Sequence, residues 1–194
     1  MVPRPAVFLD RDGVINRETD YVHTVDGFHF IEGVIDACLE LTRAGYRLIV
    51  ITNQAGIARS YYTEDDFHHL TKWMLHEFTQ QGVEIDGVYY CPHHPVHGVG
   101  DYRRSCNCRK PAPGMILRAA QEHSLDLPHS ILIGDKATDI EAGRAAGVGC
   151  CVLVLTGHPV NSKDLDKADA VFDDLPGVSN ALVNNKLCAE RLLA

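Results

Sequence analysis

The stretch AVFLDRDG, residues 6–13, decides the fold class of this chain. Its four apolar residues predict a buried strand, and two carboxylates follow that strand without a spacer. Because a strand end fixes the backbone of Asp10, the side chains of Asp10 and Asp12 can converge on one metal ion and one phosphorus atom. A solvated Asp-Gly turn explains the same spacing equally well. The rest of the chain has to decide between the two interpretations.

Apolar runs like the first one recur along the chain, with helical patterns between most of them. The expected strands are residues 6–9, 47–51, 85–90, 130–133 and 150–155. Helical spacing predicts four helices, which run from Val34 until Gly45, from an N-cap at Thr63 to before Gly82, from Pro113 through Ala120, and from Asp139 to Ala146. This alternation is typical of an α/β fold: a Rossmann-like domain with a central parallel sheet and helices on both faces.

Length and composition predict one domain over residues 1–194. No inserted cap domain is expected, because the predicted strands and helices fill the intervals between the polar strand ends. The net charge is −8 and no basic block occurs, which argues against a nucleic-acid partner and favours a small metabolite. We find neither a signal peptide nor the roughly 20 apolar residues that cross a bilayer. A cytoplasmic protein without a membrane partner, and a monomer, are therefore expected. Seven cysteines without a secretory signal do not suggest a disulfide framework, and Cys38, Cys150, Cys151 and Cys188 are expected to be core thiols.

The segment 91–110 interrupts the alternation and has the ligands of a structural zinc site. Its candidate ligands are Cys91, His93, Cys106 and Cys108. Two pairs with one residue between the partners can complete a tetrahedral Cys3His set. Such a set has no open position, so the zinc would staple the loop and take no part in catalysis. His94 and His97 remain competitors for the histidine position.

Arg109 and Lys110 follow the last zinc ligand directly, and the staple would hold both cations in place. A lysine offers a point charge to a phosphoryl group, and an arginine offers a planar fork to a second phosphate or a carboxylate. A pair of surface cations is the alternative interpretation.

Two further strands end in polar residues. Thr52, Asn53 and Gln54 follow the second strand, where a hydroxyl and backbone N–H groups can hold phosphoryl oxygens. An ordinary turn explains this segment as well. Asp135 follows the strand that ends at residue 133 and is a candidate metal ligand, whereas Asp139 fits the acidic start of a helix as well as a functional role.

The order Asp10, Asp12, Thr52, Lys110, Asp135 resembles the haloacid dehalogenase-like superfamily of phosphohydrolases. The resemblance implies that Asp10 is the nucleophile and Asp12 the general acid and base, with Thr52 and Lys110 on the phosphoryl group. It also implies a catalytic Mg²⁺ on the Asp10 and Asp135 carboxylates and the Asp12 backbone carbonyl. To donate a proton near neutral pH, Asp12 needs a raised pKa, which a neighbouring carboxylate would provide.

Three segments narrow the resemblance to the zinc-loop group of sugar bisphosphate and histidinol phosphate phosphatases: residues 10–16, 91–95 and 106–111. A sugar phosphate substrate is implied, with Arg109 on its second phosphate. The residues implied to contact the substrate besides Arg109 are Glu18, Thr19, Asp20, Tyr21, Asn53, Gln54 and Lys136. Histidinol phosphate is the alternative substrate, a plain polar loop is the alternative for residues 18–21, and a non-catalytic sugar-phosphate-binding protein is the alternative class.

Overall fold

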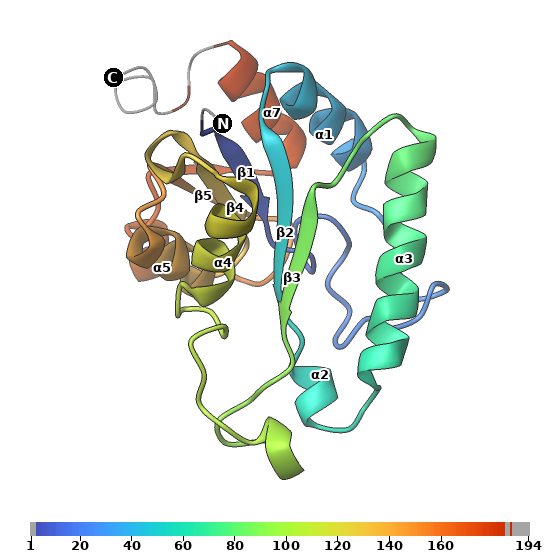
Figure 1. The fold of residues 1–194 in the computed structure, drawn as a ribbon. Coiled ribbons are helices and arrows are strands. Elements are labelled where there is room, and N and C mark those ends of the chain that lie inside the picture. The colour runs from blue at the N-terminus through green and yellow to red at the C-terminus, as the bar shows by residue number, and fades with distance from the viewer. Residues whose placement is uncertain (1–2, 185–186, 188–194) are drawn as a thin grey trace.

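A computed structural model describes residues 3–184 and 187. Its centre is a parallel sheet of six strands in the order β3-β2-β1-β4-β5-β6 (Figure 1). The strands are β1 (Ala6–Leu9), β2 (Arg47–Asn53), β3 (Gly87–Cys91), β4 (Ile131–Gly134), β5 (Cys150–Val154) and β6 (Ala170–Phe172). The first strand lies in the middle, where Phe8 pairs with Ile49 on one side and Leu132 on the other.

Helices follow most of the strands. The α-helices are α1 (Val34–Arg43), α2 (Ala55–Ala58), α3 (Glu64–Gln80), α4 (Gly114–His123), α5 (Ala137–Ala146), α6 (Ser162–Leu165) and α7 (Leu175–Val183). Short 3-10 turns occur at Gly100–Tyr102 and Leu127–His129. No second folded unit is inserted between these strands within the described ranges, as expected of a chain without a cap domain. The domain boundary at residue 194 remains a prediction.

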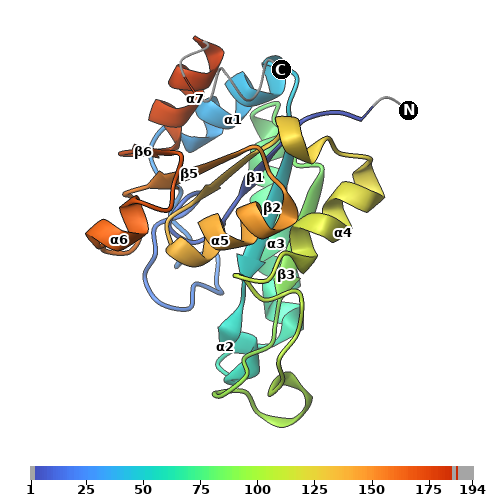
Figure 2. The same ribbon diagram turned by 90° about the vertical axis from the view of Figure 1, so that its left-hand side faces the viewer.

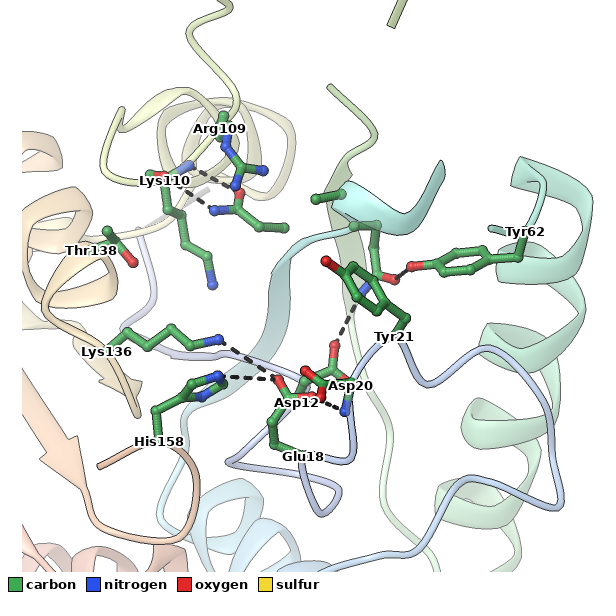
Figure 3. Close-up of a pocket in the computed structure, with 13 residues that line it drawn as sticks. Asp12, Glu18, Asp20, Tyr21, Tyr62, Arg109, Lys110, Lys136, Thr138 and His158 are labelled. Atoms are coloured by element: carbon green, nitrogen blue, oxygen red, sulfur yellow. Dashed lines mark hydrogen bonds and ion pairs between the residues drawn. The ribbon is translucent and has the colours of Figure 1, made fainter. Parts of the chain in front are cut away.

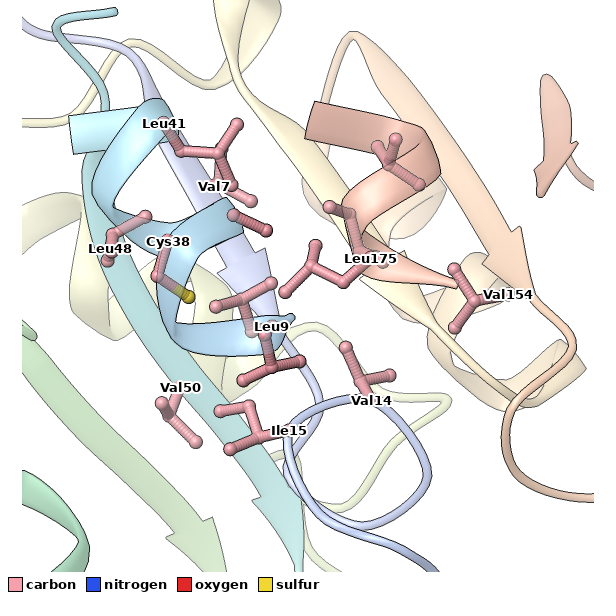
Figure 4. Close-up of a cluster of buried hydrophobic side chains, with 14 of the residues drawn as sticks. Val7, Leu9, Val14, Ile15, Cys38, Leu41, Leu48, Val50, Val154 and Leu175 are labelled. Carbon is pink, nitrogen blue, oxygen red and sulfur yellow. The ribbon is translucent and has the colours of Figure 1, made fainter. Parts of the chain in front are cut away.

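Alternation along the strands gives the sheet two apolar faces. Val7 and Leu9 point into a core with α1, α3 and α7 (Figure 4), whereas Ala6 and Phe8 pack in the opposite core with α4 and α5. Figure 2 shows the two helix layers on either side of the sheet, with the segment between β3 and α4 extending past the sheet end. All four residues of β1 are fully buried, which explains why their sequence is continuously apolar.

The ends of the helices follow the local signals in the sequence. Thr63 caps α3 as expected: its hydroxyl accepts from the Asp66 N–H, and Asp66 accepts in return from the Thr63 N–H. Gly147 ends α5 with a φ of 84°, in the left-handed region that suits glycine. Helix α5 begins at Ala137, two residues earlier than expected, so Asp139 lies in its first turn and accepts from the Lys136 N–H.

Some elements were not expected from the sequence. Strand β6 has the sequence AVF, and none of its three residues is buried, so its apolar run is too short to stand out in the sequence. Helix α7 did carry usable signals, because Asp174 caps it and Pro176 lies in its first turn. Among the cysteines, Cys38 is a buried thiol as expected. The expectation was wrong for Cys150, which is disulfide-bonded, and Cys188 lies outside the described residues.

None of the described helices has both the length and the apolar character that crossing a membrane requires.

Candidate active site

The carboxyl ends of β1, β2 and β4 meet at one edge of the sheet because these strands are neighbours. Asp10 follows β1, Thr52 lies near the end of β2, and Asp135 follows β4. All three are almost completely buried, with 6%, 1% and 1% of their surface exposed. The shared edge therefore concentrates polar groups where an open α/β sheet binds its ligands.

Lys110 brings a buried cation to this edge from the loop before α4. Its Nζ lies 2.9 Å from Asp10 Oδ1 and 2.7 Å from Asp139 Oδ1, and it donates to the Ile51 carbonyl at 2.9 Å. Burial disfavours the charged amine, but the two carboxylates raise the pKa of Lys110 above its ordinary value. The side chain is therefore a fixed ammonium. A reciprocal pair of hydrogen bonds between its backbone and the Asn53 amide, both 3.1 Å, holds the loop to β2.

Asp12 is held by donors on three sides. Arg11 forms a bidentate pair with it, with contacts of 2.9 and 3.0 Å from Nη2. Asn16 Nδ2 donates to Oδ1 at 3.0 Å and Gln54 Nε2 donates to Oδ2 at 3.1 Å. Gln54 also donates to Thr52 Oγ1 at 2.8 Å, so one amide links Asp12 to the phosphoryl-binding candidate on β2.

These donors overturn the expectation of a raised pKa at Asp12. Burial favours the neutral acid, but the Arg11 guanidinium and the hydrogen bonds from Asn16 and Gln54 outweigh it and lower the pKa of Asp12. Asp12 is thus a carboxylate in this conformation, the form that a general base requires.

The environment of Asp10 acts in the opposite direction. Burial raises the pKa of Asp10 to about 6, with a further contribution from the Asp139 and Asp12 charges, and Lys110 opposes the rise. The Arg11 N–H donates to Asp10 Oδ1 at 2.7 Å. Asp10 is therefore ionised at neutral pH.

Three carboxylates could hold a metal ion at this edge. Asp10, Asp135 and Asp139 each offer a buried oxygen, and these oxygens lie within 4.8 Å of one another. Asp135 Oδ1 is buried and has no hydrogen-bond partner among the described residues, as expected of an oxygen reserved for a cation. Hard oxygen donors suit Mg²⁺. The sequence placed Asp10 and Asp135 here, and the structure adds Asp139.

A cavity of about 330 Å³ opens at this end of the sheet, with Asp12 and Lys110 in its lining (Figure 3). Of the residues expected to contact substrate, it is lined by Glu18, Asp20, Tyr21, Asn53, Gln54, Arg109 and Lys136. Thr19 is exposed and is not one of the lining residues. Across the cavity, Lys136 Nζ lies 3.7 Å from Glu18 Oε2.

The cavity also has lining residues that the sequence did not suggest: Ala55, Tyr62, Thr138 and His158. His158 comes from the loop after β5, and the rule that polar residues at strand ends are candidates could have found it. Tyr62 donates to Gln54 Oε1 from the turn before α3, and no local pattern marks it.

The loop cysteines and one histidine form a second cluster. The three sulfurs of Cys91, Cys106 and Cys108 lie 3.2 to 3.5 Å apart, and His93 Nδ1 lies 3.6 and 3.7 Å from two of them. In a tetrahedral site with Zn–S bonds of about 2.3 Å, sulfurs are separated by about 3.8 Å. The sulfurs thus lie slightly closer together than in such a site, and the four ligand atoms are already gathered as one ion would require.

The competing histidines lie outside this cluster. His94 Nδ1 accepts from the N–H groups of Val96 and His97 at 3.2 and 3.0 Å, and the rings of His94 and His97 pack against each other. Among the described residues, His93 is therefore the histidine that completes the set.

Comparisons with known proteins agree with this fold and site. Residues 107–178 match the model of the HAD-hydrolase-like family. A curated relative from Vibrio cholerae is 49% identical over 94% of this chain and 98% of its own length. The chain belongs to the haloacid dehalogenase-like hydrolases.

The names of these relatives specify a substrate as well as a family. The Vibrio cholerae protein is a D-glycero-beta-D-manno-heptose-1,7-bisphosphate 7-phosphatase, and so is a Haemophilus influenzae protein that is 49% identical, over 91% of this chain and 97% of that one. A crystal structure of D,D-heptose 1,7-bisphosphate phosphatase from B. bronchiseptica, complexed with magnesium and phosphate, is similar at a TM-score of 0.81. It is 31% identical and covers 93% of this chain and 99% of that one.

Proposed function

We propose that this chain hydrolyses the C7 phosphate of D-glycero-β-D-manno-heptose 1,7-bisphosphate to give heptose 1-phosphate and inorganic phosphate. The relatives that share nearly half of its residues over almost their whole length support this substrate and its β anomer. The observation that carries the proposal is the buried contact of Lys110 with Asp10 beside a cavity lined by Arg109 and Lys136. The product would serve the synthesis of lipopolysaccharide precursors.

Two aspartates have separate roles in the proposed reaction, one as nucleophile and one in proton transfer. Asp10 attacks the phosphorus, the bond to the C7 oxygen breaks, and an aspartyl phosphate forms while Asp12 delivers a proton to the departing oxygen. Asp12 then takes a proton from the water that attacks the phosphoryl group and releases phosphate from Asp10. Since Asp12 is a carboxylate when Arg11 pairs with it, the acid step requires Asp12 to leave that pairing.

Lys110 and Thr52 stabilise the phosphoryl group. The Lys110 ammonium already faces Asp10, so it can neutralise charge that develops on the transferred oxygens. Thr52 Oγ1 accepts from Gln54 Nε2, which leaves the hydroxyl proton free to donate to a phosphoryl oxygen.

Mg²⁺ is the metal that fits the carboxylate cluster, held by Asp10, Asp135 and the Asp12 backbone carbonyl, with Asp139 nearby. When bound, it supplies positive charge that stabilises the phosphoryl group in the transition state. The unpartnered Asp135 Oδ1 and the hard oxygen donors support this assignment.

Zn²⁺ is the metal that fits the Cys3His cluster, where it has a structural role. The cluster lies directly before Arg109 in the chain, and Arg109 Nη1 donates to the His93 carbonyl at 3.2 Å. Zinc would therefore position Arg109 for the second phosphate of the substrate, at C1, while Lys136 and Glu18 line the cavity beside it. A sugar phosphate needs no macromolecular partner, so we propose a cytoplasmic enzyme that acts as a monomer.

The decisive experiment measures phosphate release with Mg²⁺ from heptose 1,7-bisphosphate and, in parallel, from histidinol phosphate. We expect a strong preference for the heptose and an intact 1-phosphate in the product. A preference for histidinol phosphate would replace the substrate but keep the mechanism.

The Asp10→Asn variant tests the chemistry itself. It should form no radiolabelled phospho-enzyme, whereas the Asp12→Asn variant should lose turnover and still bind a phosphate analogue. If radiolabelled phosphate still became attached to the Asp10→Asn variant, another residue would be the nucleophile. If the unmodified protein released phosphate from neither substrate, a non-catalytic sugar-phosphate-binding protein would be favoured.

A further inference from the structure

His158 makes an unusual contact for a residue on a surface loop. It follows β5 by four positions, and its side chain is 39% exposed. Its backbone N–H and its ring Nδ1 lie 3.0 and 2.8 Å from the same oxygen, Oδ2 of Asp135. Because a carboxylate oxygen accepts, the ring donates from Nδ1, which defines one tautomer.

Two glycines enclose the same Asp135 oxygen. A Cβ on Gly13 would come within 2.5 Å of Oδ2, and a Cβ on Gly157 within 2.0 Å. The Thr156 hydroxyl donates to the Gly13 carbonyl at 2.6 Å and ties the His158 loop to the turn after β1. The chain thus leaves room for this carboxylate oxygen and no more.

The surroundings of the other Asp135 oxygen, Oδ1, are different. Oδ1 is buried and has no hydrogen-bond partner in the described part of the chain, and Asp135 offers one oxygen to the carboxylate cluster with Asp10 and Asp139. Because His158 and the two glycines occupy the surroundings of Oδ2, Oδ1 is the oxygen that remains available to a cation. Turning the plane of the Asp135 carboxylate away from this orientation would break both donations from His158. The imidazole therefore fixes the orientation in which Asp135 offers its second oxygen to the cluster.

We propose that His158 is a positioning residue for the metal site: its Nδ1–H holds Asp135 Oδ2 so that Oδ1 is presented to the cation. This inference rests on the proposed Mg²⁺ chemistry but not on the identity of the sugar. The opposite ring nitrogen, Nε2, lies 4.0 Å from Glu18 Oε2, so the same ring also borders the substrate cavity (Figure 3). His158 thereby joins the metal site to the cavity wall.

The test separates the two ring nitrogens. His158→Asn keeps a donor near the place of Nδ1, whereas His158→Leu removes it. Calorimetric titration with Mg²⁺ alone, without substrate, should show a Kd about 10- to 100-fold weaker for His158→Leu and close to that of the unmodified protein for His158→Asn. With substrate, His158→Asn should keep the Mg²⁺ concentration for half-maximal activity.

A matched control comes from a second His–Asp pair. His129 Nδ1 lies 2.9 Å from Asp126 Oδ2, and its side chain is 41% exposed, but the pair is outside the cavity. His129→Leu should leave Mg²⁺ binding unchanged. The inference is overturned if His158→Leu binds Mg²⁺ like the unmodified protein, or if His158→Asn loses as much affinity as His158→Leu. Since no sugar is present in the titration, an error in the proposed substrate leaves this result unaffected.

Discussion

Lys110 Nζ lies 2.9 Å from Asp10 Oδ1, and both side chains are almost completely buried. The two residues are far apart in the chain: Asp10 directly follows β1, and Lys110 follows the loop that contains the Cys/His cluster. The pair therefore links the candidate nucleophile to the loop that contains the cysteine cluster.

Replacing Lys110 should damage activity and stability together. In Lys110→Met, Asp10 and Asp139 lose their shared cation and remain buried beside each other. We expect kcat/KM to fall at least ~100-fold, and the free energy of unfolding to fall by roughly 3–5 kcal/mol. Lys167→Met is the control, because Lys167 is exposed and its ion pairs with Glu141 and Asp164 should contribute little to stability. Near-normal turnover of Lys110→Met would remove Lys110 from the phosphoryl-binding role.

The pH dependence of kcat/KM should report Asp10. The nucleophile must be ionised, and burial raises its pKa to about 6, so activity should rise with pH through an acid limb. A bound cation favours the carboxylate, so this limb should lie below 6 at saturating Mg²⁺ and move up toward 6 as Mg²⁺ is lowered. Rate profiles at several Mg²⁺ concentrations measure this shift. If the midpoint pH of the acid limb did not change with the Mg²⁺ concentration, Asp10 would not contact the metal.

Chelation of zinc should expose the loop thiols selectively. Burial raises the pKa of Cys38 to about 12, so this thiol stays protonated at neutral pH and should resist iodoacetamide in the folded protein. Cys106 and Cys108 are only partly buried and should be alkylated once the metal is removed. Peptide mass spectrometry before and after chelation measures both, and activity should fall in parallel because Arg109 and Lys110 lose their support. Full activity after complete zinc loss would refute the coupling.

Thr63→Ala should weaken the start of α3. The capping box with Asp66 is lost, at an expected cost of about 1 kcal/mol in the free energy of unfolding. Thr79→Ala is a control in the same helix, because the Thr79 hydroxyl only donates back to the Leu75 carbonyl. Urea denaturation of both variants makes the comparison, and equal stabilities would show that the cap contributes little.

Local patterns in the sequence predicted the fold class and the ends of several helices and strands. Apolar runs marked five of the six strands. Four of them, β1, β2, β4 and β5, are buried on both faces of the parallel sheet and leave a continuous signal, whereas the edge strand β3 is only partly buried. The apolar run of β6 was too short to predict a strand, since this edge strand has only three residues and none of them is buried. The resemblance to haloacid dehalogenase-like enzymes named Asp10, Asp12, Thr52, Lys110 and Asp135, and the fold brings all five to one sheet edge.

The electrostatic state of these residues depended on tertiary structure. Sequence spacing suggested that a neighbouring carboxylate raises the pKa of Asp12, but the fold turns Arg11 onto Asp12 and lowers it. The position of Lys110 between Asp10 and Asp139 and the contact of His158 with Asp135 also depended on the tertiary structure. In both cases residues that are far apart in the chain come together, and no local pattern in the sequence predicts such a contact. The sequence by itself determined which chemical groups stand at the strand ends. Only the tertiary structure decided which of them pair, because burial and the nearest charge set the pKa and the orientation of each side chain.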